Sequence, residues 1–234
     1  MCERHKPHTR KRLRSHGPTL PTCNARNGTQ MPLATRSPYT ITTVLIALNA
    51  LVFLAMVASG ISFIQPSPVD VFRWGADYGP ATIGAHQYWR LFTAMFLHFG
   101  IIHIGMNMFV LFQVGPAIEV TFGRLRYIAL YLFSGIFASM VSLWIHPRSV
   151  GAGASGAIFG LYGAIFAFIL DNRHTLAPAA VRTITRSAGI FVLYNVAYGS
   201  VSRTTDLAAH IGGLIGGFLA GLLLQRPRPQ AVLP

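Results

Sequence analysis

Six apolar stretches separated by short polar breaks run through most of this chain. A helix needs roughly 20 mostly apolar residues to cross the hydrocarbon core of a bilayer. The pattern therefore predicts an all-α polytopic membrane protein, with spans at residues 41–64, 91–114, 127–145, 155–170, 183–198 and 206–224. The fifth span is the least apolar, because Arg186 lies near its start.

The segment between the first two spans, residues 65–90, is too long for a tight turn. It contains Trp74, Tyr78, Tyr88 and Trp89, and aromatic side chains of this kind favour the bilayer interface. We expect the segment to lie partly in the outer leaflet. An ordinary interfacial anchor would account for the same aromatic content.

Composition agrees with the membrane assignment. Only 11% of the residues are charged, whereas soluble domains carry about 25%, and the mean hydropathy is +0.48. Both cysteines, Cys2 and Cys23, precede the first span. We therefore expect neither a disulfide scaffold nor a thiolate metal site in the membrane part, and no cofactor.

The formal net charge of +13 is distributed unevenly, since eight of the 19 basic residues lie in the first 36. Residues 1–38 are predicted to be a disordered tail, residues 39–225 the membrane domain, and residues 226–234 a short second tail. A basic tail beside a span favours anionic lipid and orients the protein, and we expect no nucleic-acid partner. An organellar transit peptide would also fit the first tail.

Orientation follows from the basic residues. With both tails in the cytoplasm, 15 basic residues lie inside and four outside, namely Arg73, Arg90, Arg148 and Arg203. The positive-inside rule favours this arrangement. We expect a multi-pass protein of a bacterial inner or plasma membrane with both termini cytoplasmic.

Four polar residues in the predicted spans stand out. Ser155 begins the fourth span within GAGASGAIFG, and His210 lies one turn into the sixth. His103 and Asn107 are four apart, so they share one helix face in the second. A serine at a helix start is more often a cap, and a lone buried histidine is often only a satisfied core group. Together they supply a nucleophile, a base and further hydrogen-bond donors at similar depth.

Small residues recur every four positions in the fourth and sixth spans, which favours close packing of these two helices. Such packing would bring Ser155 beside His210, although packing alone would explain the small residues. The fourth span contributes Gly156, Gly160 and Ala164, and the sixth carries two stripes, Ala209/Gly213/Gly217/Gly221 and Gly212/Gly216/Ala220.

The chain resembles the rhomboid intramembrane serine proteases over about residues 40–225. The resemblance rests on five motifs in order: Trp89-Arg90, His103-x3-Asn107, Gly115-x3-Glu119-x3-Gly123, Gly153-Ala154-Ser155-Gly156 and Ala209-His210-Ile211-Gly212-Gly213. The GxSG motif alone is weak, and the set of five is specific. The implied fold is a six-helix rhomboid-like bundle.

The resemblance also implies an activity and its residues. It implies a serine endopeptidase that cleaves single-span membrane proteins, with Ser155 as nucleophile and His210 as general base. His103, Asn107 and the Ser155 N–H would stabilise the oxyanion. The chain departs from some members in having Phe159 where they have a tyrosine that stacks on the histidine, and we expect the phenyl ring to pack there.

Four other polar residues are expected to have supporting or structural roles. Asp206, one turn before His210, could assist it electrostatically. Glu119 is expected to cap or bridge helices at the inner end, and Arg90 to anchor a loop or a lipid headgroup. His98, five residues before His103, should point away from it and serve packing or the loop.

Alternative functions remain open at this point. One is a catalytically silent binder or chaperone of membrane helices on the same scaffold. Another is a haem or metal protein with His103 and His210 as ligands, which the glycine stripes disfavour because they indicate tight contact. A zinc or an aspartyl intramembrane protease fits poorly, since the chain has no HExxH motif and no pair of intramembrane aspartates.

Overall fold

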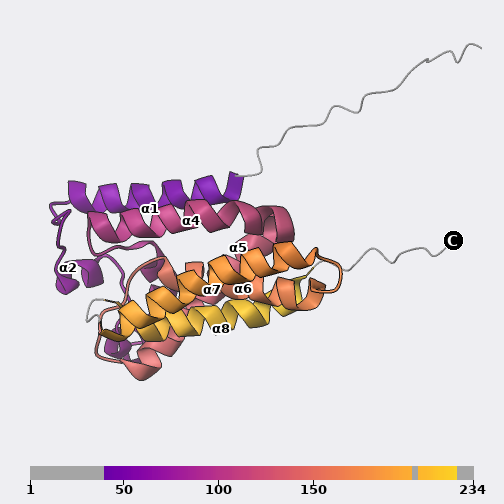
Figure 1. The fold of residues 1–234 in the computed structure, drawn as a ribbon. Helices are drawn as coiled ribbons and strands as arrows, with labels where there is room; N and C mark the ends of the chain where they lie inside the picture. Colours follow the sequence, from indigo (N-terminus) through magenta and orange to yellow (C-terminus); the bar gives the residue numbers. More distant parts are fainter. Residues whose placement is uncertain (1–39, 202–204, 226–234) are drawn as a thin grey trace, which may run out of the picture. The chain divides into compact units, whose positions relative to one another are not determined.

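The computed structural model describes residues 40–201 and 205–225, and the two predicted tails lie outside them. In these ranges the chain is helical. The long helices are α1 (Thr40–Ala58), α4 (Ile101–Phe122), α5 (Arg124–Ile145), α6 (Ser155–Asn172), α7 (Pro178–Val201) and α8 (Leu207–Leu224) (Figure 1). Four short pieces join α1 to α4: α2 (Pro68–Arg73), η1 (Pro80–Gly84), α3 (Arg90–Thr93) and η2 (Ala94–Phe96).

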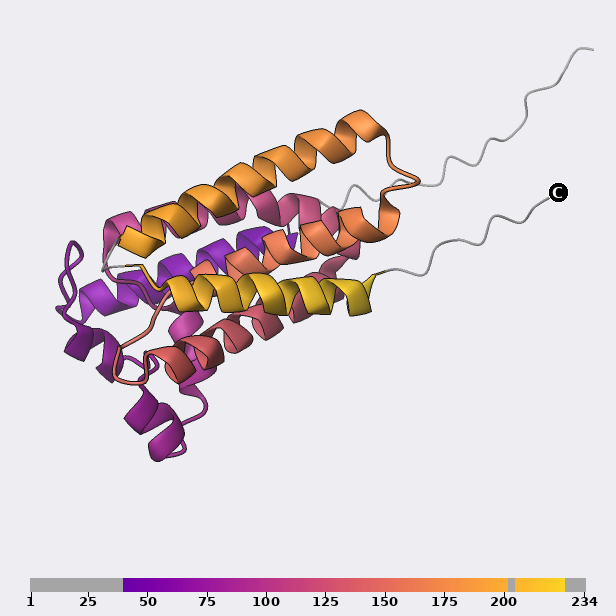
Figure 2. The same cartoon turned by 60° about the horizontal axis from the view of Figure 1, so that its bottom comes forward.

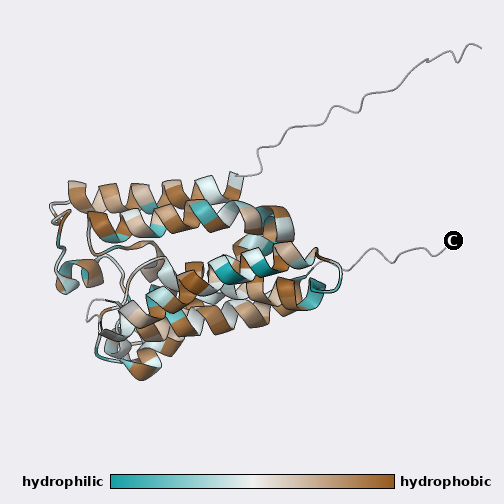
Figure 3. Ribbon diagram, viewed as in Figure 1, coloured by the Kyte–Doolittle hydropathy of each residue, from teal (hydrophilic) through white to brown (hydrophobic). Residues whose placement is uncertain are grey.

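Five of the long helices, all except α7, have the length and apolar composition to cross a membrane. The chain is therefore an integral multi-pass membrane protein, and the all-α prediction is confirmed. The sixth span stays a prediction. At 24 residues α7 is long enough, but it carries Arg182 and Arg186, and hydrophilic positions are visible on it in Figure 3.

Two helix groupings organise the described chain. α1 packs along α4, while α5, α6 and α8 pack against one another most extensively, α6 with α8 above all (Figures 1 and 2). α7 makes fewer contacts, mainly with α6, and Figure 2 shows it at the edge of the group. The two helices predicted to lie together are therefore neighbours.

The glycine stripes explain why α6 and α8 approach so closely. A Cβ on Gly213 would overlap the carbonyl oxygen of Gly156, and one on Gly217 would overlap that of Gly160. The second stripe of α8 faces α5, where Gly212 meets the Val141 side chain and Gly216 meets Phe137. Each stripe therefore faces a different helix. In both places the small residues allow the two helices to approach closely.

The predicted start of the second span, at Leu91, is wrong. Residues 90–96 form α3 and η2, and α4 begins only at Ile101, after Gly100 at φ +102°. The Ile101 N–H donates to the Phe63 carbonyl at 2.8 Å, and a Cβ on Gly100 would overlap the carbonyl oxygen of Ile64. The short helix η2 has already ended at Phe96, where Leu97 becomes extended, and the left-handed Gly100 with this close approach fixes the start of α4. The second long helix therefore runs about eight residues further than predicted, to Phe122.

Other boundaries move less. The first span ends at Ala58 rather than residue 64, since Gly60 adopts φ +92°. The fifth extends beyond residues 183–198 at both ends, to Pro178–Val201. The connection between the first two long helices consequently covers residues 59–100, a longer segment than the predicted 65–90.

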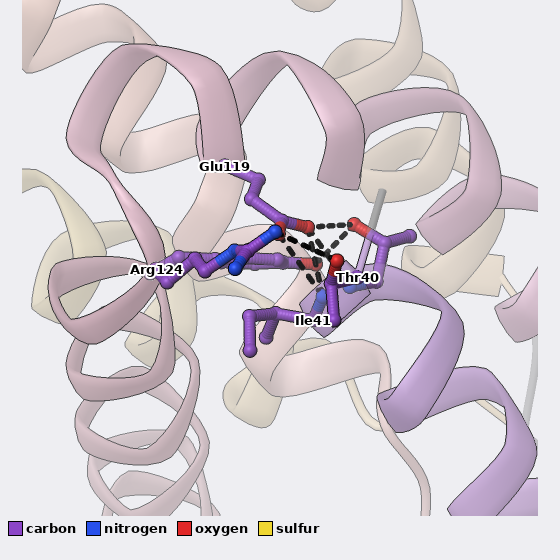
Figure 4. Close-up of polar contacts among 6 residues, drawn as sticks. Thr40, Ile41, Glu119 and Arg124 are labelled. Atoms are coloured by element: carbon purple, nitrogen blue, oxygen red, sulfur yellow. Dashed lines mark hydrogen bonds and ion pairs between the residues drawn. The ribbon is translucent and has the colours of Figure 1, made fainter. Parts of the chain in front are cut away.

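Glu119 bridges helices as predicted (Figure 4). Its carboxylate accepts hydrogen bonds from the N–H groups of Ile41 at 3.0 Å and Thr42 at 3.2 Å, in the first turn of α1. Arg124 lies 3.4 Å from Glu119 and also donates to the Thr40 hydroxyl at 2.8 Å. One buried carboxylate thus caps α1 and joins it to the α4–α5 turn.

Arg90 anchors the connection between α1 and α4 and does not reach toward lipid headgroups. It is buried, and its guanidinium donates to the carbonyls of Phe72 at 2.8 Å and Ala76 at 2.9 Å and to Gln87 at 2.6 Å. The guanidinium also lies over the Phe72 and Trp89 rings. These contacts hold residues 72–76 in place, and this segment leads directly to Asp77 at the candidate site.

Candidate functional site

Ser155 is the first residue of α6, as the sequence predicted. The preceding turn depends on Gly153, whose φ of +136° is strained for any residue with a side chain. The Gly153 N–H donates to the Ala94 carbonyl at 2.9 Å, which ties the turn to the α1–α4 connection. Ser155 is half-buried and lines a small cavity.

His210 lies in the first turn of α8 and is buried. The Asp206 carboxylate caps this helix by accepting the Ala209 N–H at 2.9 Å, and the Ser142 hydroxyl of α5 donates to its other oxygen. Phe159 stacks on the His210 ring at a centroid distance of 4.1 Å and an angle of 11°. The predicted packing of the phenyl ring against the imidazole is therefore confirmed.

Ser155 and His210 lie beside one of the contacts between α6 and α8. A Cβ on Gly156, the neighbour of Ser155, would lie 3.7 Å from the carbonyl oxygen of Ala209, the neighbour of His210. Three residues further along α8, Gly213 contacts Gly156 directly. The serine and the histidine thus occupy the end of the seam at which both helices begin.

His103 lies beside the glycine turn. The Phe99 N–H donates to His103 Nδ1 at 3.2 Å, so a neutral imidazole carries its proton on Nε2. A Cβ on Gly153 would lie 3.0 Å from His103 Nε2 and 3.8 Å from Ser155 Oγ. The His103 N–H donor and the Ser155 hydroxyl therefore border the same space next to Gly153.

Asn107 is buried one turn further into α4. Its side-chain amide donates to the His103 carbonyl at 2.8 Å. This bond uses one of its two N–H groups and leaves the other for a ligand. Because α4 starts at Ile101, His103 and Asn107 fall in its first two turns, near the starts of α6 and α8.

The expectation that His98 points away from His103 is wrong. His98 is fully buried and meets His103 edge to face, with ring centroids 5.1 Å apart. The expectation assumed one continuous helix through both residues. The chain instead turns at Gly100, which brings His98 back against the ring. His98 therefore packs against His103, and packing was one of the two roles predicted for it.

A cavity of about 30 Å³ adjoins Ser155. Glycine and alanine form its apolar wall, and its polar lining comprises Ser155, Ser139, Ser142, Asp77 and Asp206. Burial raises the pKa of Asp77 to about 7, as does the Asp206 charge, while the Ser139 hydroxyl and the Gly151 N–H oppose the rise. The sequence analysis did not identify Asp77 as a site residue. The only signal available was that acidic residues are rare, six in 234.

Among residues 40–201 and 205–225, no three histidine, cysteine, aspartate or glutamate side chains are grouped closely enough to hold a metal ion. Phe159 occupies one face of the His210 ring.

The fold and site define a polytopic helical membrane protein that gathers a serine and two histidines where three of its helices begin. A model of the rhomboid domain matches residues 85–227. The chain belongs to the rhomboid family.

Three relatives show the range of this similarity. Rhomboid protease GluP of Bacillus subtilis is 36% identical over 192 residues, covering 82% of this chain and 36% of that protein. RHOMBOID-like protein 2 of Arabidopsis thaliana is 39% identical over 165 residues, 70% of this chain and 51% of that protein. Rhomboid-like protease 2 of Toxoplasma gondii is 31% identical over 177 residues, 74% of this chain and 61% of that protein. The chain thus spans between about a third and three fifths of the length of these relatives.

Proposed function

We propose that this protein is an intramembrane serine endopeptidase that cleaves single-span membrane proteins in or near the outer part of their transmembrane helix. The observation that carries the proposal is the α6–α8 contact, which sets the residue after Ser155 against the residue before His210. The names of the relatives from B. subtilis and T. gondii, both proteases, agree with it.

In this proposal Ser155 and His210 act as a dyad. The Ser155 hydroxyl attacks the scissile carbonyl while His210 accepts its proton and later passes it to the leaving amine. A water molecule then hydrolyses the acyl-enzyme by the same route. Asp206 is held by the Ala209 N–H and the Ser142 hydroxyl, so its role is to cap α8 and position His210.

The tetrahedral intermediate would be stabilised beside Gly153. The His103 Nε2–H, the Asn107 amide and the Ser155 N–H are the donors we assign to the oxyanion. The last of these is at the N-terminus of α6, where N–H groups lack intrahelical acceptors and the helix dipole favours negative charge.

The substrate must be a helix that unwinds. A transmembrane helix keeps its carbonyls bonded within the segment, so cleavage requires local unwinding, favoured by small residues or proline near the top of the span. We propose that α7 and the loop at residues 198–205 form the gate, and residues 202–204 of this loop lie outside the described ranges. α7 meets α6 chiefly through aromatic rings, with Phe191 stacked on Tyr162 at 4.3 Å and lying 5.7 Å from Phe159.

The membrane orientation is proposed from charge. Both tails would be cytoplasmic, because 15 of the 19 basic residues then lie inside. The first tail would contact anionic lipid. A bacterial inner or plasma membrane stays a prediction, since the relatives come from a bacterium, a plant and a parasite.

A serine-directed fluorophosphonate probe tests the assignment. The purified protein in detergent should be labelled, and Ser155→Ala should abolish both labelling and cleavage of a model single-span substrate. Ser139→Ala is a matched control, because it removes another serine from the same cavity. Labelling that persists in Ser155→Ala would refute the nucleophile. Helix binding without labelling or cleavage would instead favour the silent binder.

A further inference from the structure

The first ten residues of α7, at the edge of the helix group in Figure 2, lie outside the packed part of the bundle. Of residues 178–187, nine are exposed and Val181 is half-buried. The helix is held by its later turns, where Ala188 and Val192 are buried and Phe191 contacts rings of α6. The first part of α7 therefore presents its surface to the surrounding membrane.

α7 is also longer than its neighbours. It has 24 residues, against 18 each in α6 and α8, so it exceeds either by about 9 Å. Arg182 lies 19 residues, about 29 Å, from the end of the helix at Val201, and Arg186 lies 15 residues, about 22 Å, from it. The hydrocarbon core of a bilayer is about 30 Å thick. With Val201 at one face of this core, Arg182 lies at the other face, and the long Arg186 side chain extends to it.

Arg182 and Arg186 form a positively charged pair at that depth. They are one helical turn apart, so both side chains reach the same ligand. Residues 172–201 contain three arginines and no acidic residue, and Asp171, at the end of α6, already has an interaction of its own. Among the described residues, neither guanidinium of the pair has an ion-pair or hydrogen-bond partner. The pair therefore offers two charged donors to an external anion.

The same face of α7 becomes apolar toward the middle of the helix. At about 100° per residue, Gly189, Ile190 and Leu193 lie within about 60° of the direction of the arginine pair. Ile190 is 57% exposed and Leu193 is 70% exposed, and a Cβ on Gly189 would meet nothing within 4 Å. The buried Ala188 and Val192 lie on a face about 120° away. An acyl chain can therefore lie along the open, apolar part of this face.

The order of charge and apolar surface along α7 matches that of a phospholipid. Two guanidinium groups attract a phosphodiester, and they repel the ammonium group that a zwitterionic lipid also carries. We propose that Arg182 and Arg186 bind the headgroup of one anionic phospholipid, whose acyl chain lies along Gly189 and Leu193. Since we also propose α7 as the gate, this lipid would hold the end of the gate that is farthest from Ser155. The site itself does not depend on the proposed protease function.

The test locates where a lipid contacts the full chain. The purified protein is placed in nanodiscs of phosphatidylcholine that contain a small amount of phosphatidylglycerol with a photoreactive group in its acyl chain. After illumination, mass spectrometry identifies the labelled residues. Photoreactive phosphatidylcholine is used in parallel. We expect phosphatidylglycerol to label residues 187–197 at least tenfold more often per molecule, because each basic residue near the membrane surface favours anionic lipid by about fivefold.

Variants connect this labelling to the arginine pair. Arg182→Gln combined with Arg186→Gln should reduce labelling by phosphatidylglycerol to the level of phosphatidylcholine. Both positions are exposed, and glutamine has nearly the helix propensity of arginine, so the helix should be retained. Arg126→Gln is the matched control, because it removes an arginine from the first turn of α5, which also begins at the end of the bundle opposite to Ser155. Its labelling should equal that of the wild type.

Three results would overturn the inference. The first is equal labelling of residues 187–197 by the two lipids in the wild type, and the second is unchanged labelling in the double variant. The third is loss of phosphatidylglycerol labelling when inorganic phosphate is added at constant ionic strength, which would identify a soluble anion as the occupant. None of these measurements involves cleavage, so their outcome is separate from that of the protease assignment.

Discussion

Widening the α6–α8 seam by one methyl group should separate Ser155 from His210. The change is Gly213→Ala. Gly213 lies three residues after His210 and contacts Gly156, the neighbour of Ser155. The substitution alters no group that we assign to the chemistry, so its effect on activity reports on helix placement.

The contact between Gly213 and Gly156 determines how far α8 must move away from α6. A Cβ on Gly213 would lie 2.8 Å from the Gly156 carbonyl carbon, and it would overlap the carbonyl oxygen. Ordinary contact begins at 3.4 Å, so the carbonyl carbon alone requires the helices to separate by about 0.6 Å, and the overlapping carbonyl oxygen, which is the limiting contact, requires more. Misplacement of reacting groups by about 1 Å can cost roughly 10²-fold in rate. Overpacking of this kind typically costs about 1–3 kcal/mol of stability.

The assay compares kcat/KM for a model single-span substrate with thermal unfolding in detergent. Gly213→Ala should lose at least tenfold in kcat/KM while still unfolding cooperatively at a lower temperature. Gly105→Ala in α4 is the matched control, because nothing lies within 4 Å of a Cβ there. It should keep full activity, with stability unchanged or raised by about 0.5–1 kcal/mol.

Gly212→Ala provides an intermediate case. Its Cβ would lie 2.7 Å from the Cβ of Val141, an atom fixed to the α5 backbone, so the change pushes α8 away from α5 and not directly away from α6. We expect a smaller loss of activity than in Gly213→Ala. Wild-type activity and stability in Gly213→Ala would refute the reasoning, as would equal damage from Gly105→Ala.

Three further predictions concern single side chains. His210→Ala should abolish cleavage, while Asn107→Ala should retain activity reduced by up to roughly 10²-fold, since other oxyanion donors remain; single-turnover cleavage assays distinguish the two. Glu119→Ala should lower the free energy of unfolding by about 2–3 kcal/mol because it leaves the first N–H groups of α1 unpaired, and Glu119→Gln by less, as measured by thermal unfolding in detergent. Because the pKa of Asp77 is raised from 3.8 to about 7, the folded state binds this proton more tightly, and the contribution of Asp77 to stability should fall by up to about 3 kcal/mol from pH 5 to pH 8. Burial lowers the pKa of His98 to about 3, which acts in the opposite direction, so the contribution of Asp77 is measured as the difference in stability between the wild type and Asp77→Asn at each pH. An equal difference at both pH values would contradict it.

The features that the sequence predicted well are encoded locally. Apolar stretches of sufficient length identify membrane helices without any knowledge of their neighbours. The four-residue spacing of glycines in α6 and α8 places small surfaces on one helix face, and those surfaces pack as predicted. Ser155 at a helix start and His210 one turn into a helix follow from the same local signals.

The features that could not be predicted from the sequence depend on contacts between distant segments. The break at Gly100 is set by the approach of residues 63 and 64, so hydropathy alone extended the helix through it. Asp77 joins the site through pairing with Gly151, and no spacing rule connects these two positions. The same break explains His98, whose direction could not follow from helical periodicity.

The corrected start of α4 also explains why the polar residues can converge. His103 is in the first turn of α4, Ser155 begins α6, and His210 is in the first turn of α8. The contacts of Gly153 with His103 and of Gly156 with Gly213 bring these three starts together. Each start exposes N–H groups and the positive end of a helix dipole. The starts of α6 and α8 line the cavity beside Ser155, and under the proposed function they would favour the negative charge of an oxyanion. The connection that covers this end therefore contributes to the electrostatics of the site as well as to its shape.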